Sequence, residues 1–422
     1  MPTNKSNYYA LGIIAILFFV FGFITWVNGV LIPYFQICLE LTNFQSLWVA
    51  FASYIAYFVM AIPSAYILKT TGYKKGMVIG LIVMALGTAV FLPAAYTRTY
   101  GLFLTGLFIT GTGLALLQTA ANPYVAIIGP IESTAQRVGI MGVANKTAGI
   151  LSQQILGTIF LLSADSIVAS VAKANAVERA AILDEYVLKV VNPYLVITVI
   201  LLLLAVLIGF SRLPEVQESG APETSPNQQK KTSVFQYPYL VLGVLALFMA
   251  GGCEVIPIDC IILYSKAMGI PLQEARHFTE YTLYAMLGGY ITSTIVIPKY
   301  ISQQAALRYV SILGLLFSFG AYSTEGLTSI GFMIAMGFGA ALLWGTIWGL
   351  AVRELGRFTK IGAALLLMSV VGGGLFPLMF GRMIDIYPAN PQMAALVLVP
   401  CYAFLLFYAI KGYQIKNWRP NE

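Results

Sequence analysis

The stretch LVITVILLLLAVLIGF, Leu195–Phe210, contains no charged and no amide side chain, and it lies inside a longer apolar segment at 192–212. Crossing the hydrocarbon core of a bilayer takes about 20 helical residues, because that core is about 30 Å thick. Only a helix or a closed barrel satisfies its backbone hydrogen bonds in lipid. The segment is therefore predicted to be a membrane-spanning helix.

Eleven further segments of the 422-residue chain have the same character. They are 8–36, 44–69, 76–95, 100–128 and 137–163 before it, and 238–264, 277–298, 305–322, 327–352, 359–383 and 393–414 after it. Hydrophobic residues make up 59% of the chain and charged residues 10%, which no soluble domain of this length tolerates on its surface. We expect an all-α membrane protein with 12 transmembrane helices.

The spans fall into two sets of six on either side of one polar, proline-containing segment. This predicts a first bundle at 1–212, a linker at 213–237 and a second bundle at 238–422. The tract Ala115-Leu116-Leu117 on the fourth span of the first set is echoed by Ala341-Leu342-Leu343 in the second set. Two pseudo-symmetric bundles related by duplication place a binding site near the midplane where they meet, and rocking would open that site to either side in turn.

Basic residues predict the orientation. Of the 24 Lys and Arg residues, 16 lie in the amino terminus, the linker, the carboxyl terminus and the loops on their side. The positive-inside rule then makes both termini cytoplasmic, in a multi-pass protein of the cytoplasmic (inner) membrane. The net charge of +7 is assigned to contact with membrane lipid rather than nucleic acid.

The loop at 163–192 has apolar residues at helical spacing and predicts one amphipathic helix on the outer surface.

Polar groups inside the spans are expensive in lipid and mark candidate functional residues. The amides are Asn28, Gln118, Asn122, Asn145, Gln153 and Gln154. Amides suit sugar hydroxyls because each offers a donor and an acceptor, and Trp26, Trp344 and Trp348 could pack on the apolar face of a sugar ring. Bonding to a neighbouring helix is the plain alternative for each amide, and interfacial anchoring is the alternative for the tryptophans.

Three charged residues are candidates for cation coupling. Glu254 lies sixteen residues into its span, past the midplane, where a carboxylate could accept a proton outside and release it inside. A structural ion pair with Lys146 is the alternative. Lys146 needs a carboxylate, a helix carbonyl or substrate opposite, unless it extends to the membrane surface. Asp259 is nearer the outer end and could simply reach water.

Catalytic sets and phosphate loops are not recognisable, and the four cysteines are scattered rather than spaced as metal ligands. We therefore expect no enzyme, no cofactor and no metal site.

The layout and the basic turn between the second and third spans resemble the major facilitator superfamily. More specifically, LLQTAANPYV at Leu116–Val125 is similar to the fourth helix of the fucose:proton symporter family. Further matches are NGVLIPYF at Asn28–Phe35, LTNFQ at Leu41–Gln45, GLFLTGLFI at Gly101–Ile109, GGCEV at Gly251–Val255 and MSVVGGGLFPLMFG at Met368–Gly381. The resemblance implies a carrier of a monosaccharide with a proton or sodium ion, and we expect this carrier to be a monomer.

Two departures from that family change the expectation. Gly29 and Gln118 stand where the fucose branch has Asp and Glu, so its coupling scheme cannot be transferred intact. Gln118 and Glu254 instead match the glucose and galactose branch. The resemblance therefore implies cation-coupled uptake of glucose, galactose or N-acetylglucosamine. The alternatives are an uncoupled sugar facilitator and, in another class, a drug exporter of the same fold.

Overall fold

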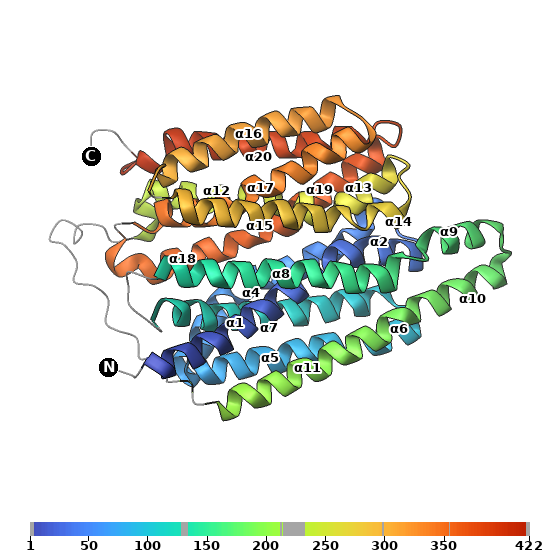
Figure 1. Cartoon of the computed structure of the whole chain (residues 1–422), viewed down its shortest axis with the longest axis horizontal. Coiled ribbons are helices and arrows are strands. Elements are labelled where there is room, and N and C mark those ends of the chain that lie inside the picture. The colour runs from blue at the N-terminus through green and yellow to red at the C-terminus, as the bar shows by residue number, and fades with distance from the viewer. Residues whose placement is uncertain are drawn as a thin grey trace.

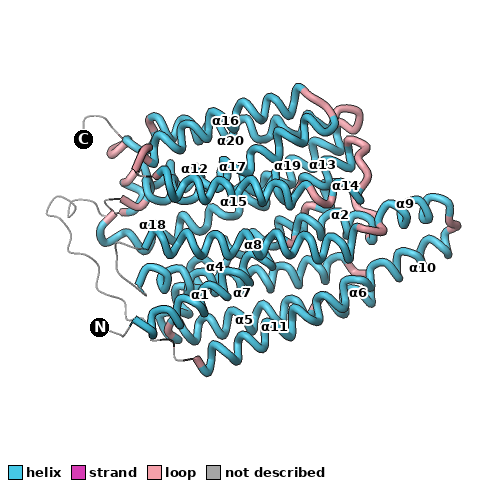
Figure 2. Tube along the Cα trace, viewed as in Figure 1, coloured by secondary structure: helices cyan, strands magenta, loops and turns pink. Residues whose placement is uncertain are grey.

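The computed structural model describes residues 4–127, 134–211, 213, 233–297, 299–353 and 355–418. These residues form helices joined by short turns (Figure 2). The first half contains α1 (Asn4–Trp26), α2 (Asn28–Cys38), α3 (Asn43–Ser46), α4 (Trp48–Thr71), α5 (Tyr73–Ala89), α6 (Phe91–Thr97), α7 (Tyr100–Ile127), α8 (Thr134–Leu161), α9 (Ala164–Lys173), α10 (Ala176–Val187), η2 (Leu188–Val190) and α11 (Val191–Phe210).

The second half begins after the predicted linker, of which 214–232 lies outside the described residues. It contains η4 (Val234–Gln236), α12 (Pro238–Asp259), α13 (Ile261–Ala267), α14 (Leu272–Ala275), α15 (Phe278–Val296), α16 (Gln303–Ser323), α17 (Gly326–Ala351), η5 (Gly356–Phe358), α18 (Thr359–Met368), η6 (Ser369–Val371), α19 (Gly372–Ile386), η7 (Pro391–Val397), α20 (Leu398–Ile410) and η8 (Gly412–Gln414).

Eleven segments within the described residues are long and apolar enough to cross a membrane, and each matches a predicted span. The twelfth predicted span, 277–298, corresponds to α15, which packs against α17 and α8. Large apolar side chains on the outside of the bundle, such as Leu203 and Phe210 on α11, are exposed as expected of a surface that faces lipid. The fold is the expected 12-helix arrangement of two six-helix bundles.

The helices run roughly side by side along the long axis of the molecule (Figure 1). Both ends of the chain lie at one end of the bundle, which we call the terminal end. The turn at Gly72 between α4 and α5 is at this end too. We call the opposite end, where α2 finishes and α6, α9 and α14 lie, the distal end.

Two predicted spans are broken near the place where the halves meet. The first span, expected as one helix at 8–36, is interrupted at Val27, between α1 and α2. The first span of the second half, expected at 238–264, is interrupted at Cys260, between α12 and α13. Pro33 lies inside α2 and Pro257 inside α12, and a proline removes one backbone donor and strains the preceding turn. Helix breaks in such folds accompany binding sites.

The segment at 163–192 differs from the expected single surface helix. It forms α9 and α10, which project beyond the bundle as extensions of α8 and α11 (Figure 1). Asn175 caps α10 by accepting from the backbone N–H groups of Val177 and Glu178 at 3.0 Å each. This capping box starts a new helix and explains the division in two.

Glycines let the two halves approach closely along α19. A Cβ on Gly374 would lie 2.9 Å from the Cα of Phe51, and one on Gly381 would lie 3.0 Å from the carbonyl oxygen of Asn43. Both partners belong to the first half. These glycines on the eleventh span therefore serve close helix packing, as small residues do in membrane proteins.

Candidate functional site

The two halves are joined in the middle of the bundle by a buried ion pair. The Lys146 Nζ on α8 lies 3.3 Å from Glu254 Oε1 on α12, and the side chains are 3% and 10% exposed. Lys146 therefore does not extend to the membrane surface. The pair that the sequence offered as an alternative role for Glu254 is present in the structure. A buried pair of this kind resists the loss of either partner, because the remaining charge would stand alone in a low-dielectric interior.

The first half holds Lys146 in place from α1. Its Nζ lies 3.7 Å from the centroid of the Trp26 ring, a cation–π contact, while Trp26 Nε1 donates to Asn145 Oδ1 at 3.0 Å. Gly22 permits this arrangement, since a Cβ there would lie 1.8 Å from the backbone oxygen of Asn145. Gly149 likewise leaves room for the indole of Trp26.

Asp259 does not reach water, which corrects the expectation for this residue. It is 0% exposed at the last position of α12, and neither carboxylate oxygen has a hydrogen-bond partner of good geometry among the described residues. Asn28, 3% exposed, is its neighbouring amide, and Glu254 and Lys146 are the neighbouring charges. Asp259 is buried because α2 packs over the end of α12, an arrangement that residue spacing does not predict.

The amides separate into two groups. Gln153 is fully buried and donates to the backbone oxygen of Trp26, while Asn145 donates to Phe18 at 3.4 Å. These bonds match the plain alternative of helix-to-helix contact. Gln154, at the surface, donates to Tyr284 Oη of the second half at 3.3 Å.

The second group has accessible surface. Gln118 is half-buried and Asn122 is exposed, both on α7. Trp344 and Trp348 on α17 are half-buried, with ring centroids 6.3 Å apart in a stacked arrangement, so they share one helix face as their spacing predicts. Next to them, a Cβ on Gly345 would meet open space.

Two carboxylates at the distal end tie the halves together, and the sequence analysis missed both. Asp165 on α9 accepts from the backbone N–H groups of Leu272 at 3.0 Å and Gln273 at 2.9 Å, at the start of α14. Asp385 on α19 accepts from the backbone of Asn43 at 3.1 Å and of Phe44 at 2.8 Å, at the start of α3. Each anion lies at a helix N-terminus of the other half, where unpaired N–H groups favour it.

A chain of side-chain hydrogen bonds continues from Asp385 across the interface. Asn43 Nδ2 donates to Asp385 at 2.7 Å, Gln36 Nε2 donates to Asn43 at 2.8 Å, and Lys266 Nζ donates to Gln36 at 2.8 Å. Lys266 and Asp385 belong to the second half and the two amides to the first. The chain thus crosses the interface twice and has opposite charges at its ends. We refer to Asp165, Asp385 and their partners as the distal latches.

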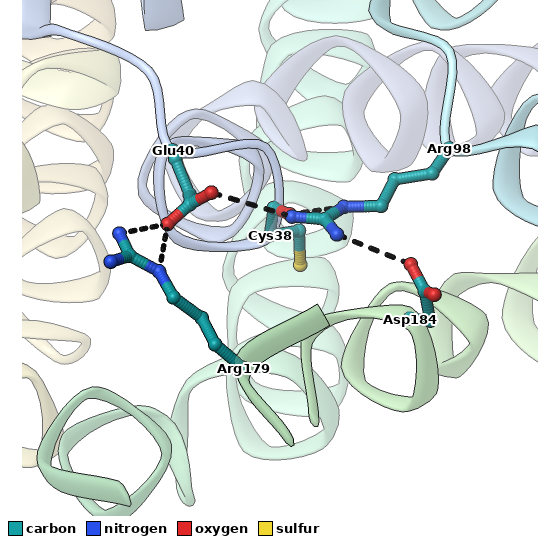
Figure 3. A network of polar contacts seen from close by, with 5 residues as sticks. All are labelled: Cys38, Glu40, Arg98, Arg179 and Asp184. Atoms are coloured by element: carbon teal, nitrogen blue, oxygen red, sulfur yellow. Dashed lines mark hydrogen bonds and ion pairs between the residues drawn. The ribbon is translucent and has the colours of Figure 1, made fainter. Parts of the chain in front are cut away.

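A second polar network stiffens the distal end of the first half itself (Figure 3). Arg98 donates to the carbonyl of Cys38 at 2.9 Å and pairs with Asp184 at 3.2 Å, and Glu40 accepts from Arg179 Nε at 2.6 Å. Glu40 and Arg98 have φ of 54° and 47°, the left-handed conformation that non-glycine residues rarely adopt. The network holds them there and joins the end of α2, the α6–α7 turn and α10 into one unit.

Twelve spans in two bundles, with charged and amide groups buried at their junction, define the class of this protein as a membrane transporter. The sequence profile of the Major Facilitator Superfamily matches residues 14–377. The chain belongs to this family, whose members are transporters rather than enzymes.

Relatives match over nearly the whole chain. A glucose/galactose transporter of Brucella abortus biovar 1 (strain 9-941) is 32% identical over 415 residues, which cover 97% of this chain and 96% of the relative. An L-fucose-proton symporter of Escherichia coli (strain K12) is 28% identical over 411 residues, which cover 96% and 93%. The crystal structure of the transporter FucP in the outward conformation matches with a TM-score of 0.71 and 28% identity, covering 96% of this chain and 98% of that one.

Proposed function

We propose that the protein carries a monosaccharide inward together with a proton by alternating access. The observation that carries this proposal is the charged cluster of Lys146, Glu254 and Asp259 buried where the halves meet. A transporter that only opened and closed around a sugar would not need three ionisable groups buried between its halves, and such groups inside a membrane protein are costly and usually functional. The names of the relatives support a sugar as cargo, and one of them names a proton.

The proposed sugar site lies between α7 and α17. Gln118 and Asn122 would exchange hydrogen bonds with the hydroxyl groups, and Trp344 and Trp348 would pack on the apolar face of the ring. Trp26, Asn28, Asn145 and Gln153 would form the wall behind it, next to the charged cluster. In this proposal Glu254, Lys146 and Asp259 couple the sugar to the cation.

The proposed orientation places the terminal end in the cytoplasm, with the linker, in the cytoplasmic membrane. The excess of Lys and Arg at this end supports that orientation. The described conformation, with its distal latches made, is then closed toward the outside. We further propose a monomer surrounded by lipid.

Uptake by proteoliposomes tests the function. Labelled glucose, galactose, N-acetylglucosamine and fucose are offered under a pH gradient alone or a sodium gradient alone. Uphill accumulation of one of the first three sugars under the pH gradient is expected. A gradient of about 1.6 pH units supplies about 2.2 kcal/mol per proton, at about 1.4 kcal/mol per tenfold ratio, which is enough for a sugar gradient on the order of 40-fold. Uphill accumulation only with sodium would indicate a sodium symporter, and equilibration without uphill accumulation under either gradient would indicate a facilitator; both results would contradict proton coupling.

A further inference from the structure

Asp259 is an unusual carboxyl group for a folded protein. Its side chain is completely buried, and both oxygens lack a hydrogen-bond partner among the described residues. It is the last residue of α12, where the aligned peptide dipoles already present partial negative charge. An ionised carboxylate in that position would have no hydrogen bond to offset its lost hydration. The neutral acid loses much less hydration free energy on burial.

The charges around Asp259 are those of Glu254, which repels a second negative charge, and of Lys146, which attracts one. Glu254 and Cys260 are its neighbours on and next to α12, Lys146 faces it from α8, and Tyr54 faces it from α4. The amide of Asn28 on α2 lies beside it and carries no charge. Lys146 is already paired with Glu254 at 3.3 Å. Two carboxylates and one ammonium leave a single excess negative charge, which one proton neutralises.

Asp259 also lies at the seam that must open. A Cβ on Gly29 of the first half would lie 3.2 Å from the carbonyl oxygen of Ile258, the residue before Asp259. The aspartate is five residues nearer the distal end than Glu254, about 7.5 Å along the helix axis. Separation of α2 from α12 at the distal end would therefore expose Asp259 to water on that side before Glu254.

We infer that Asp259 is the proton-binding group of the coupling site: it is loaded from the distal side and is held as the neutral acid, between the halves, while Lys146 and Glu254 remain an ion pair. This inference rests on the proposed function and specifies it. Sodium is a less suitable occupant, because the Lys146 ammonium already supplies a fixed cation and a metal ion would need a shell of oxygen ligands. The deprotonated form belongs to the conformation in which the seam is open to water.

Infrared difference spectroscopy on the full-length protein in liposomes tests the inference directly. A change from acid to alkaline buffer should reveal the carbonyl stretch of a buried protonated carboxyl group, and Asp259→Asn should lack that band. The matched control is Glu280→Gln. Glu280 is also a buried carboxyl group, at 6% exposure, but it has a polar partner, since Glu280 Oε1 lies 3.4 Å from His277 Nδ1. This variant should keep the band. A band that persists in Asp259→Asn would overturn the inference.

Transport measurements give a second and independent readout. In Asp259→Asn, uphill accumulation under a pH gradient should fall from the order of 40-fold to equal concentrations, while sugar counterflow continues. Asp259→Glu restores a protonatable group and should recover part of the accumulation, which shows that loss in the Asn variant is not misfolding. Full accumulation in Asp259→Asn would overturn the inference, even if the protein is a proton-coupled transporter. A wild type that carries no sugar would instead overturn the proposed function, and the infrared band would still decide the state of Asp259.

Discussion

Asp165 and Asp385 occupy equivalent places in the two halves and make equivalent bonds. Asp165 follows α8, the fifth span of the first half, and Asp385 is the second-last residue of α19, within the fifth span of the second half. Each accepts two backbone N–H bonds from the short helix that precedes the second span of the opposite half. The duplication that the span count indicates is thus repeated in the contacts that close the distal end.

Loss of a latch carboxylate is expected to shift the protein toward a conformation open at the distal end. Asp385→Asn weakens three hydrogen bonds to a charged acceptor, and such bonds each contribute about 1.5–3 kcal/mol. Spin labels on Val177 and Tyr387, one in each half, would report the distance between the distal ends by double electron–electron resonance. We expect a longer-distance population in Asp385→Asn and a larger one in the double variant with Asp165→Asn.

Asp184→Asn is the matched control for the latches. Asp184 is also an aspartate at the distal end, but it pairs with Arg98 inside the first half and is 61% exposed. The distance distribution should match that of the wild type. An unchanged distribution in the double latch variant would show that the two latch carboxylates are not needed to keep this end closed.

The pair of Lys146 and Glu254 should behave as a unit in stability measurements. Lys146→Met or Glu254→Gln alone leaves one buried charge without its partner, which typically costs about 3–5 kcal/mol. The double variant removes both charges and should be destabilised by clearly less than the sum of the single variants. Chemical unfolding in detergent measures each free energy. Additive effects would mean that the two groups do not depend on each other.

Glu254→Gln should in addition lose uphill sugar accumulation. Without Glu254, Lys146 lacks its bonded carboxylate, and its uncompensated positive charge opposes the protonation of the neighbouring Asp259. Uptake under a pH gradient measures the loss, with counterflow as the measure of intact sugar binding. Accumulation equal to that of the wild type would remove Glu254 from the coupling mechanism.

Gln118→Ala and Asn122→Ala are expected to weaken sugar affinity. Each removes one side chain able to exchange hydrogen bonds with a hydroxyl group, at about 1 kcal/mol per neutral bond, or roughly five-fold in Kd. Binding is measured by sugar-dependent quenching of tryptophan fluorescence or by counterflow at graded sugar concentrations. Thr119→Ala is the control on the same helix, because its hydroxyl bonds to the carbonyl of Ala115 at 2.8 Å. Normal affinity in both amide variants would place the sugar elsewhere.

Gly22→Ala should be strongly destabilising. The added Cβ would lie 1.8 Å from the backbone oxygen of Asn145, so α1 must move away from α8 and take Trp26 from Lys146. Overpacking of this kind costs about 1–3 kcal/mol or more. Gly12→Ala in the same helix meets nothing within 4 Å and should be neutral or slightly stabilising, since Ala is the better helix former. Thermal unfolding of the two variants measures the contrast.

The membrane-spanning helices and their division into two sets could be predicted from the amino-acid sequence alone. This is possible because each span must satisfy its own backbone hydrogen bonds in lipid, so the requirement is local and is recorded in about 20 consecutive residues. The same argument identified Lys146, Glu254 and Asp259 as groups that need an explanation, since an ionisable side chain inside a span is costly wherever it lies.

The contacts of these groups, by contrast, follow from the packing of the folded bundles and could not be predicted. Lys146 and Glu254 are 108 residues apart, Asp165 is 107 residues from Leu272, and Asp385 is 342 residues from Asn43. Such partners depend on how whole bundles pack, and neither hydropathy nor residue spacing contains that information. The burial of Asp259 depends on such packing too. Its position near the end of a span suggested exposure to water, but α2 of the first half packs over the end of α12 and buries the side chain.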